Sequence, residues 1–326
     1  MFGGKPLGID KIPKIIIIIS LLFYNKPLKK GFKMIIDLHA HTSNHELWNL
    51  HTRLANLDTL RALAQKFGIG KIFLMATYFP LKKSGLHNLE LLERIKGDKL
   101  FDCFGSLNLE NTDLCPALDE LRLLAENNQI AGIKLYPGYQ NIVLSDPKFD
   151  PVYNLAQEFK LPVAVHLGEL QYCCLKDKRE KGELRCGRTQ CLLDKRTELS
   201  RPQQLSDAAW NFPGVNFIAC HLGNPYFSEL HAAMNFCPNI YSDISGQFVS
   251  GTAEDTPAYR ARIIEEIQLF LKLPGGMERV LFGTDFPIQS YQDTFDIVKA
   301  LNLSTDREKM LLGGNALKLM PRKGQS

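Results

Sequence analysis

The sequence predicts an α/β protein with a single domain, a (β/α)8 or TIM barrel, and three observations carry this prediction. Short apolar segments alternate with helix-like segments from Met34 almost to the C-terminus. Most of the apolar segments begin about 23 to 40 residues apart, which is the repeat expected of alternating strands and helices. The length of 326 residues also suits one such barrel.

Eight apolar segments are the candidate strands. They lie at residues 34–38, 71–76, 101–106, 131–135, 163–166, 216–220, 240–243 and 279–284. Between the first two, Asp58 is predicted to cap a helix that runs through Phe67 and stops at Gly68. Asp113 is predicted to cap another helix, which runs to about Asn127. No linker or low-complexity segment interrupts the alternation, so we predict no second domain.

The composition is that of an ordinary globular protein, with 45% hydrophobic residues. The formal net charge of +4 comes from residues 1–33, which hold seven of the 39 basic residues and one of the 35 acidic residues. The remaining chain therefore carries 32 basic and 34 acidic residues. This balance argues against nucleic-acid binding, and we expect a small-molecule partner. The composition leaves the oligomeric state open, a homo-oligomer included.

Residues 1–33 are predicted to be an N-terminal extension of a barrel that spans residues 34–321. Residues 15–23 are almost continuously apolar and have lysines on both sides, but they are far fewer than the ~20 residues of a membrane-spanning helix. No small-residue cleavage site typical of a secretory signal follows them. The simplest interpretation is a start codon assigned too early, with Met34 as the first residue. A short membrane-associated anchor and a signal peptide are the alternatives.

The longest interval between predicted strands contains a polar loop insertion, residues 171–200. It holds Cys173, Cys174, Cys186 and Cys191, whose spacing differs from the close pairs of structural zinc sites. We therefore favour a loop with reduced thiols over a structural zinc site, and we expect this loop to cover the substrate. Reduced thiols favour a cytoplasmic protein, with membrane association through the N-terminal extension as the alternative.

The most informative motif is Asp37-Leu38-His39-Ala40-His41, which ends the first predicted strand. Side chains alternate along a strand, so His39 and His41 point to the same side and form half of a metal site. Imidazole suits zinc and similar ions. Four further polar residues lie at the ends of other apolar segments: Lys134, His166, His221 and Asp285. In a parallel barrel these strand ends meet on one face, where the active site is expected.

This order of two histidines, a lysine, two more histidines and an aspartate resembles the amidohydrolase superfamily of metal-dependent (β/α)8 barrels. Six phrases narrow the resemblance to the amidohydrolase-related branch, which is similar to aminocarboxymuconate semialdehyde decarboxylase and its relatives. They are MIIDLHAHT (34–42), GIKLYPGYQ (132–140), FPGVNFIACHLGN (212–224), NIYSDISG (239–246), RVLFGTDFP (279–287) and GNALKLM (314–320). The resemblance covers nearly the whole chain outside residues 1–33.

The resemblance implies a role for each of the strand-end residues. The metal ligands would be His39, His41, His166, His221 and Asp285, binding one or two divalent ions, most simply zinc. Asp285 would also be the catalytic proton acceptor. His221 binds a second metal in binuclear relatives and acts as a general acid or base in mononuclear decarboxylating relatives, so it too is a candidate catalytic residue.

Lys134 has three interpretations. The phrase GIKLYP resembles a segment of dihydroorotases, and this likeness implies that Lys134, if carboxylated by carbon dioxide, bridges two metals. As a free ammonium, Lys134 would face an acidic substrate. The third interpretation is a strand-end lysine that reaches solvent.

Residues in the loops after the strands are candidates for substrate binding. They are His45, Trp48, Arg53, Tyr136, Tyr139, Glu169 and Asn224. Loops carry the specificity of a barrel enzyme, but their chemistry has no local signature, so the substrate cannot be named from them.

The predicted function is a metal-dependent hydrolase of the amidohydrolase type, which activates water to cleave a C–N or C–O bond of a small carbonyl substrate. The alternative is a metal-dependent carboxy-lyase (decarboxylase) or hydratase that acts on an unsaturated or aromatic carboxylic acid. In that case Lys134 or Arg53 would bind the substrate carboxylate. A catalytically silent binding protein is a third hypothesis, and the complete set of ligand residues argues against it.

Overall fold

The structure is a computed structural model that describes residues 34–43, 55–79, 85–172, 174, 176–184, 187–253 and 255–320. The predicted N-terminal extension, along with Cys173 and Cys186, lies outside these described residues. No helix in the described part is both long and apolar enough to cross a membrane.

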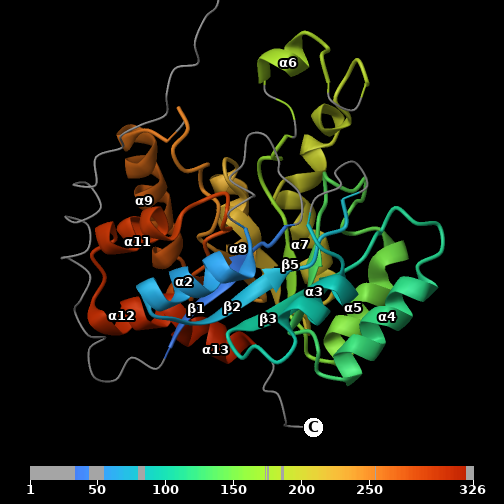
Figure 1. The fold of residues 1–326 in the computed structure, drawn as a ribbon, viewed down its shortest axis with the longest axis horizontal. Coiled ribbons are helices and arrows are strands. Elements are labelled where there is room, and N and C mark those ends of the chain that lie inside the picture. Colours follow the sequence, from blue (N-terminus) through green and yellow to red (C-terminus); the bar gives the residue numbers. More distant parts are fainter. Residues whose placement is uncertain are drawn as a thin grey trace, which may run out of the picture. The chain divides into compact units, whose positions relative to one another are not determined.

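Eight parallel strands form one sheet in the order in which they occur along the chain (Figure 1). They are β1 (Ile35–Ala40), β2 (Ile69–Met75), β3 (Phe101–Ser106), β4 (Gly132–Leu135), β5 (Val163–Val165), β6 (Phe217–Ala219), β7 (Ile240–Asp243) and β8 (Val280–Leu281). The sheet curves back on itself, because the Leu38 amide donates to Phe282 O at 3.0 Å and Ala40 bridges to Phe286. The predicted (β/α)8 barrel is therefore confirmed.

Helices connect the strands and surround the sheet (Figure 1). They are α2 (Leu57–Phe67), α3 (Asn88–Ile95), α4 (Cys115–Glu126), α5 (Asp150–Glu158), α6 (Lys176–Glu180), α7 (Gln203–Asn211), α8 (Phe227–Phe236), α9 (Pro257–Lys272), α10 (Gly276–Arg279), α11 (Tyr291–Ala300), α12 (Thr305–Lys309) and α13 (Asn315–Leu319). Their apolar residues recur at helical spacing. In α2, for example, Leu60, Ala64 and Phe67 form the buried face.

The predicted cap of α2 was wrong by two residues. Asn56 caps the helix, because its side chain accepts a hydrogen bond from the Thr59 amide at 2.8 Å, and Asp58 lies in the first turn. The predicted stop is correct: Gly68 has a φ of 69°, the left-handed conformation that glycine adopts without a Cβ clash. Similarly, α4 begins after Leu114 rather than at the predicted Asp113.

The interior of the barrel is apolar towards the N-terminal ends of the strands. Its buried residues include Ile36, Phe73, Phe104, Ile218 and Leu281. The packing is tight at Gly132, where a Cβ would lie 2.3 Å from Cε1 of Phe104. This apolar plug supports the polar residues at the opposite ends of the strands.

The loop insertion contains α6 and two short 3-10 helices, Leu192–Lys195 and Thr197–Ser200. In Figure 1, α6 stands at the top, beyond the ends of the strands. The inner part of the insertion packs against the segment after β4, since Leu193 joins Tyr136 and Tyr139 in one apolar cluster. Arg196 donates to Tyr139 O of this segment at 3.3 Å and forms an ion pair with Glu110, after β3, at 2.8 Å.

Candidate metal centre

All six predicted strand-end residues line one cavity. His39 lies in β1 and His41 just after it, Lys134 lies in β4, His166 follows β5, His221 lies in the turn after β6, and Asp285 follows β8. A parallel barrel brings the C-terminal ends of its strands to one face, and this topology assembles residues that are up to about 250 positions apart in the chain.

His39, His41 and Asp285 form the most compact group. The Nε2 atoms of His39 and His41 lie 3.5 Å and 3.2 Å from Oδ1 of Asp285. One ligand atom from each of the three residues lies within 4.8 Å of the others. Nε2 of His39 is buried and has no hydrogen-bond partner among the described residues. A divalent ion would supply the missing partner, so this group fits a metal site.

The charges of this group also suit a cation. Burial, and then the positive charge of Lys134, lowers the pKa of His39 to about 3, so its ring is neutral at pH 7. Burial alone would raise the pKa of Asp285, but the histidines around it, His221 above all, hold that pKa below its usual range. The cluster therefore offers a neutral imidazole and an ionised carboxylate, the protonation states that bind a metal.

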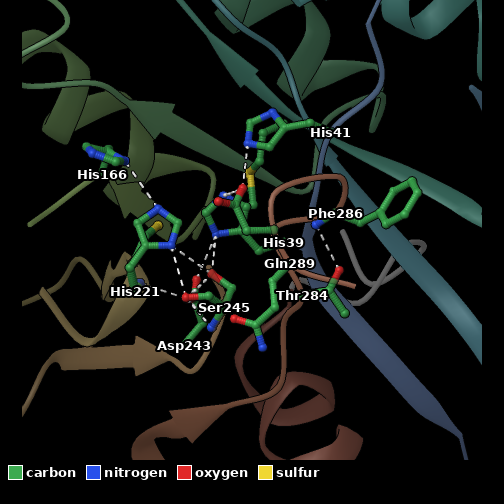
Figure 2. A network of polar contacts seen from close by, with 12 residues as sticks. His39, His41, His166, His221, Asp243, Ser245, Thr284, Phe286 and Gln289 are labelled. Carbon is green, nitrogen blue, oxygen red and sulfur yellow. Dashed lines mark hydrogen bonds and ion pairs between the residues drawn. The ribbon is translucent and has the colours of Figure 1, made fainter. Parts of the chain in front are cut away.

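His166 and His221 form a second group on the other side of the cavity (Figure 2). Nδ1 of His166 and Nε2 of His221 lie 3.2 Å apart and share a hydrogen bond. His221 has a φ of 64°, a conformation uncommon for residues other than glycine. Burial lowers the pKa of both rings. Their nitrogens already contact each other, so an ion bound there must replace this contact.

Asp243 supports both groups from the end of β7, and the sequence analysis did not single it out. Its Oδ2 lies 3.0 Å from Nδ1 of His39, and its Oδ1 accepts a hydrogen bond from the His221 amide at 2.9 Å. Ser245 adds its hydroxyl, 3.1 Å from Nδ1 of His39. The phrase NIYSDISG contained the available indication, because it places an acidic residue at a strand end.

Asp37, at the other end of the histidine motif, holds the loop that carries Asp285. Its carboxylate accepts hydrogen bonds from the Thr284 amide at 3.0 Å and the Thr284 hydroxyl at 2.7 Å. It also accepts one from the His39 amide at 3.1 Å. These contacts join β1 to the segment after β8 and so fix the distance between His39 and Asp285.

Lys134 is fully buried, and its Nζ lies 2.8 Å from Sγ of Cys220. Burial raises the pKa of the Cys220 thiol. The side chain of Lys134 lines the cavity and does not extend to solvent, so the interpretation as a lysine that reaches solvent is wrong. The carbamate and the substrate-binding cation stay as predictions.

The loop residues predicted to bind substrate divide into three sets. Tyr136 and Tyr139 line the cavity that contains the histidines. Glu169 and Asn224 line an adjoining cavity, which also includes His166, His221 and Asp285. The remaining predicted residues, His45, Trp48 and Arg53, lie outside the described residues.

The fold and this cluster define a barrel enzyme with a site for a divalent metal. The amidohydrolase family model matches residues 103–322. The chain belongs to the amidohydrolase family, as the resemblance of its motifs implied. The matched part begins after β2, so the His39 and His41 pair lies before it. No curated protein matches the chain.

Solved structures with the same fold include both hydrolases and decarboxylases. A probable 2-pyrone-4,6-dicarboxylic acid hydrolase from Acinetobacter baumannii, with citric acid bound, is 14% identical with a TM-score of 0.60, covering 88% of this chain and 99% of its own. The 5-carboxyvanillate decarboxylase from Sphingomonas paucimobilis is 14% identical with a TM-score of 0.59, covering 88% and 98%. A dihydroxybenzoic acid decarboxylase from Polaromonas, with bound manganese and an inhibitor, is 18% identical with a TM-score of 0.59, covering 88% and 96%. At these identities the likeness establishes the fold alone.

Proposed function

We propose that the chain is a metal-dependent hydrolase that cleaves a C–N or C–O bond of a small carbonyl substrate. The observation that carries the proposal is the convergence of His39 Nε2, His41 Nε2 and Asp285 Oδ1 at the C-terminal face of the barrel. One carboxylate then serves two purposes, because Asp285 contributes to the ion site and lies beside the reacting atoms.

Zinc is the ion that we propose for this site. Its preferred ligands in hydrolytic sites are imidazole nitrogens together with a carboxylate oxygen, which is the set that His39, His41 and Asp285 provide. When bound, a zinc ion polarises a substrate carbonyl and lowers the pKa of a coordinated water to roughly 7. His166 and His221 would complete the set of ligands or hold a second ion.

The chain's own residues supply the proton transfer. Oδ1 of Asp285 faces His39 and His41, whereas Oδ2 faces the backbone at Gly246, where an added Cβ would lie only 2.6 Å away. Asp285 lines the cavity, so we assign its carboxylate to accept the proton of the attacking water and to pass it to the leaving group. Meanwhile, Ser245 O lies 3.2 Å from Nδ1 of His221 and positions this ring as a further ligand or as a general acid or base.

The carboxy-lyase alternative has one observation in its favour. Phe79, Tyr136 and Tyr139 form an aromatic wall in the cavity, with the Phe79 ring centroid 4.7 Å and 4.6 Å from those of the two tyrosines. We call the part of the cavity along this wall the aromatic chamber. A wall of this kind suits a planar unsaturated acid. Nζ of Lys134 lies 5.2 Å from the Tyr136 ring centroid, and as a free ammonium it would favour a carboxylate.

Isotope labelling separates the two reactions. Zinc-loaded protein is incubated in ¹⁸O-labelled water with lactones and cyclic amides, and in deuterated water with aromatic and unsaturated carboxylic acids. We expect one ¹⁸O atom in a new carboxylate product. Release of carbon dioxide with deuterium at the carbon that had carried the carboxyl group, and no hydrolysis, would establish the carboxy-lyase instead.

A further inference from the structure

A second and larger chamber adjoins the candidate metal centre on the side of the loops after β6 and β7. Its cavity measures about 430 Å³, whereas the one that includes the aromatic chamber measures about 90 Å³. Both cavities include His166, His221 and Asp285, so a substrate held at the metal centre can extend into the larger one.

The larger cavity has a wall of neutral polar groups, and we call it the polar chamber, after Asn224, Gln247 and Tyr259. Nδ2 of Asn224 donates hydrogen bonds to Gln247 O at 3.0 Å and to the Tyr259 hydroxyl at 2.9 Å. The backbone amide of Gln247 donates to Oε1 of the fully buried Gln289 at 2.8 Å. These bonds fix the wall before any ligand arrives, which lowers the entropic cost of binding.

The described residues that line the polar chamber include acidic side chains but no lysine or arginine. The two carboxylates belong to Glu169 and Asp285. An anionic limb would lose its hydration there and would meet no lysine or arginine among the described lining residues. A substrate with one acidic and one neutral end would therefore place its neutral end in the polar chamber.

We propose that the polar chamber is a substrate subsite for an uncharged limb that both donates and accepts hydrogen bonds, of which a carboxamide is the simplest example. An amide oxygen accepts two hydrogen bonds, so Oδ1 of Asn224 and Oε1 of Gln247 can receive a limb's N–H beside their present bonds, at 3.2 Å from the Tyr259 hydroxyl and at 3.3 Å from Nδ2 of Asn224. The Tyr259 hydroxyl can turn its proton from Oδ1 of Asn224 to a limb's oxygen, which gives the third polar contact. This subsite rests on the proposed function, which places the reacting group at the metal centre.

The test uses zinc-loaded full-length protein and four hydroxamic acids. They share the metal-binding hydroxamate and an alkyl spacer, and they end in a carboxamide, a carboxylate, an ammonium or a methyl group. Calorimetry measures their dissociation constants. We expect the carboxamide to bind at least tenfold more tightly than the carboxylate compound, and more tightly than the ammonium compound. Equal or tighter binding of either charged compound would overturn the proposal.

A pair of variants locates the effect. Tyr259→Phe removes one hydroxyl from the polar chamber and should weaken the carboxamide about fivefold, the effect of one hydrogen bond, while the methyl compound is unchanged. Tyr226→Phe is the matched control, because Tyr226 lines neither cavity, and it should change no affinity. An unchanged carboxamide affinity in Tyr259→Phe would contradict the subsite.

The two proposals fail in different ways. If the wild-type protein binds neither zinc nor the methyl compound, the proposed function is wrong. The polar chamber is then decided on metal-free protein, where ligand-observed NMR shows whether the carboxamide end, and not the carboxylate end, contacts the protein and loses that contact in Tyr259→Phe. If the methyl compound binds but the four limbs are not distinguished, only the subsite is wrong.

Discussion

The two halves of the histidine cluster differ in what their nitrogens contact. On the side of β1 and β8, Nε2 of His39 is buried without a hydrogen-bond partner among the described residues and faces a carboxylate oxygen 3.5 Å away. On the side of β5 and β6, His166 and His221 bond to each other at 3.2 Å (Figure 2). Nε2 of His166 also lies 3.2 Å from Glu169 O. The first half lacks a partner that a cation would supply, and the second is satisfied by its own contacts.

This difference indicates an order of binding. A ligand set that already converges loses little free energy to rearrangement, whereas a bonded histidine pair must first give up its hydrogen bond. The supporting carboxylates follow the same division, since Asp243 contacts His39 and Asp37 holds the Thr284 segment beside Asp285. We therefore expect the first ion at His39, His41 and Asp285, and any second ion at His166 and His221.

The largest expected effect is on catalysis at the shared carboxylate. Asp285→Asn should lower kcat by about 10³-fold or more and keep most of the metal, because the amide oxygen can still contact an ion but cannot accept a proton. Steady-state kinetics and elemental analysis measure the two quantities. Asp102→Asn, at an ion pair with Lys71 away from the cavity, is the control and should retain activity. Near-normal turnover of Asp285→Asn would remove this residue from the mechanism.

Metal content tests the order of binding directly. Wild-type protein prepared without chelator should hold one or two divalent ions per chain. His39→Ala should lose the first ion at micromolar zinc, whereas His166→Ala should keep it. Elemental analysis after gel filtration gives the counts, and circular dichroism verifies that both variants are folded. Equal loss in the two variants would contradict the difference between the halves, and a folded wild-type protein without metal would contradict the whole site.

Asp243 should affect metal affinity less than a ligand does. Asp243→Asn keeps a hydrogen-bonding group beside Nδ1 of His39 but removes the negative charge that fixes the ring's tautomer. A loss of about 10- to 100-fold in zinc affinity is typical of such supporting residues. Competition with a chromophoric chelator measures it. An affinity within twofold of the wild type would assign Asp243 to the fold alone.

Lys134 determines whether the second half holds an ion at all. If carbon dioxide carboxylates its amine, intact-mass analysis in bicarbonate should show the added group, and Lys134→Ala should lose only the second ion. Short carboxylates such as acetate should then restore part of the activity, since they can replace the bridge. We expect this outcome, which requires the Nζ contact with Cys220 to open. One ion in both proteins, with no added mass, would favour the carboxy-lyase with an ammonium at Lys134.

The sequence predicted the features that depend on residues close together in the chain. The strands followed from short apolar segments, and the ligand candidates followed from histidines and an aspartate at strand ends. Asp243 was missed because its partner His39 is 204 positions away, and nothing local distinguishes it from an ordinary strand-end acid. Gln247 and Tyr259 were missed for the same reason, since a neutral side chain acquires its role only when the loops meet. The N-cap of α2 was predicted at Asp58 instead of Asn56, because aspartate and asparagine both favour the N-cap position.

The smallest effect is a pH dependence of folding. The pKa of His39 is lowered from 6.5 in the unfolded chain to about 3 in the metal-free fold, so between these values only the unfolded chain takes up the proton. This group therefore stabilises the fold fully above pH 6.5 and loses that contribution as the pH falls towards 3. Between pH 7 and pH 5.5 the loss should be about 1 kcal/mol. Urea unfolding of chelator-treated wild type and His39→Gln measures it, because the variant should lack this part of the pH dependence. The same slope in both proteins would show that His39 takes up a proton as readily in the fold as in the unfolded chain, so burial would not keep its ring neutral as pH falls.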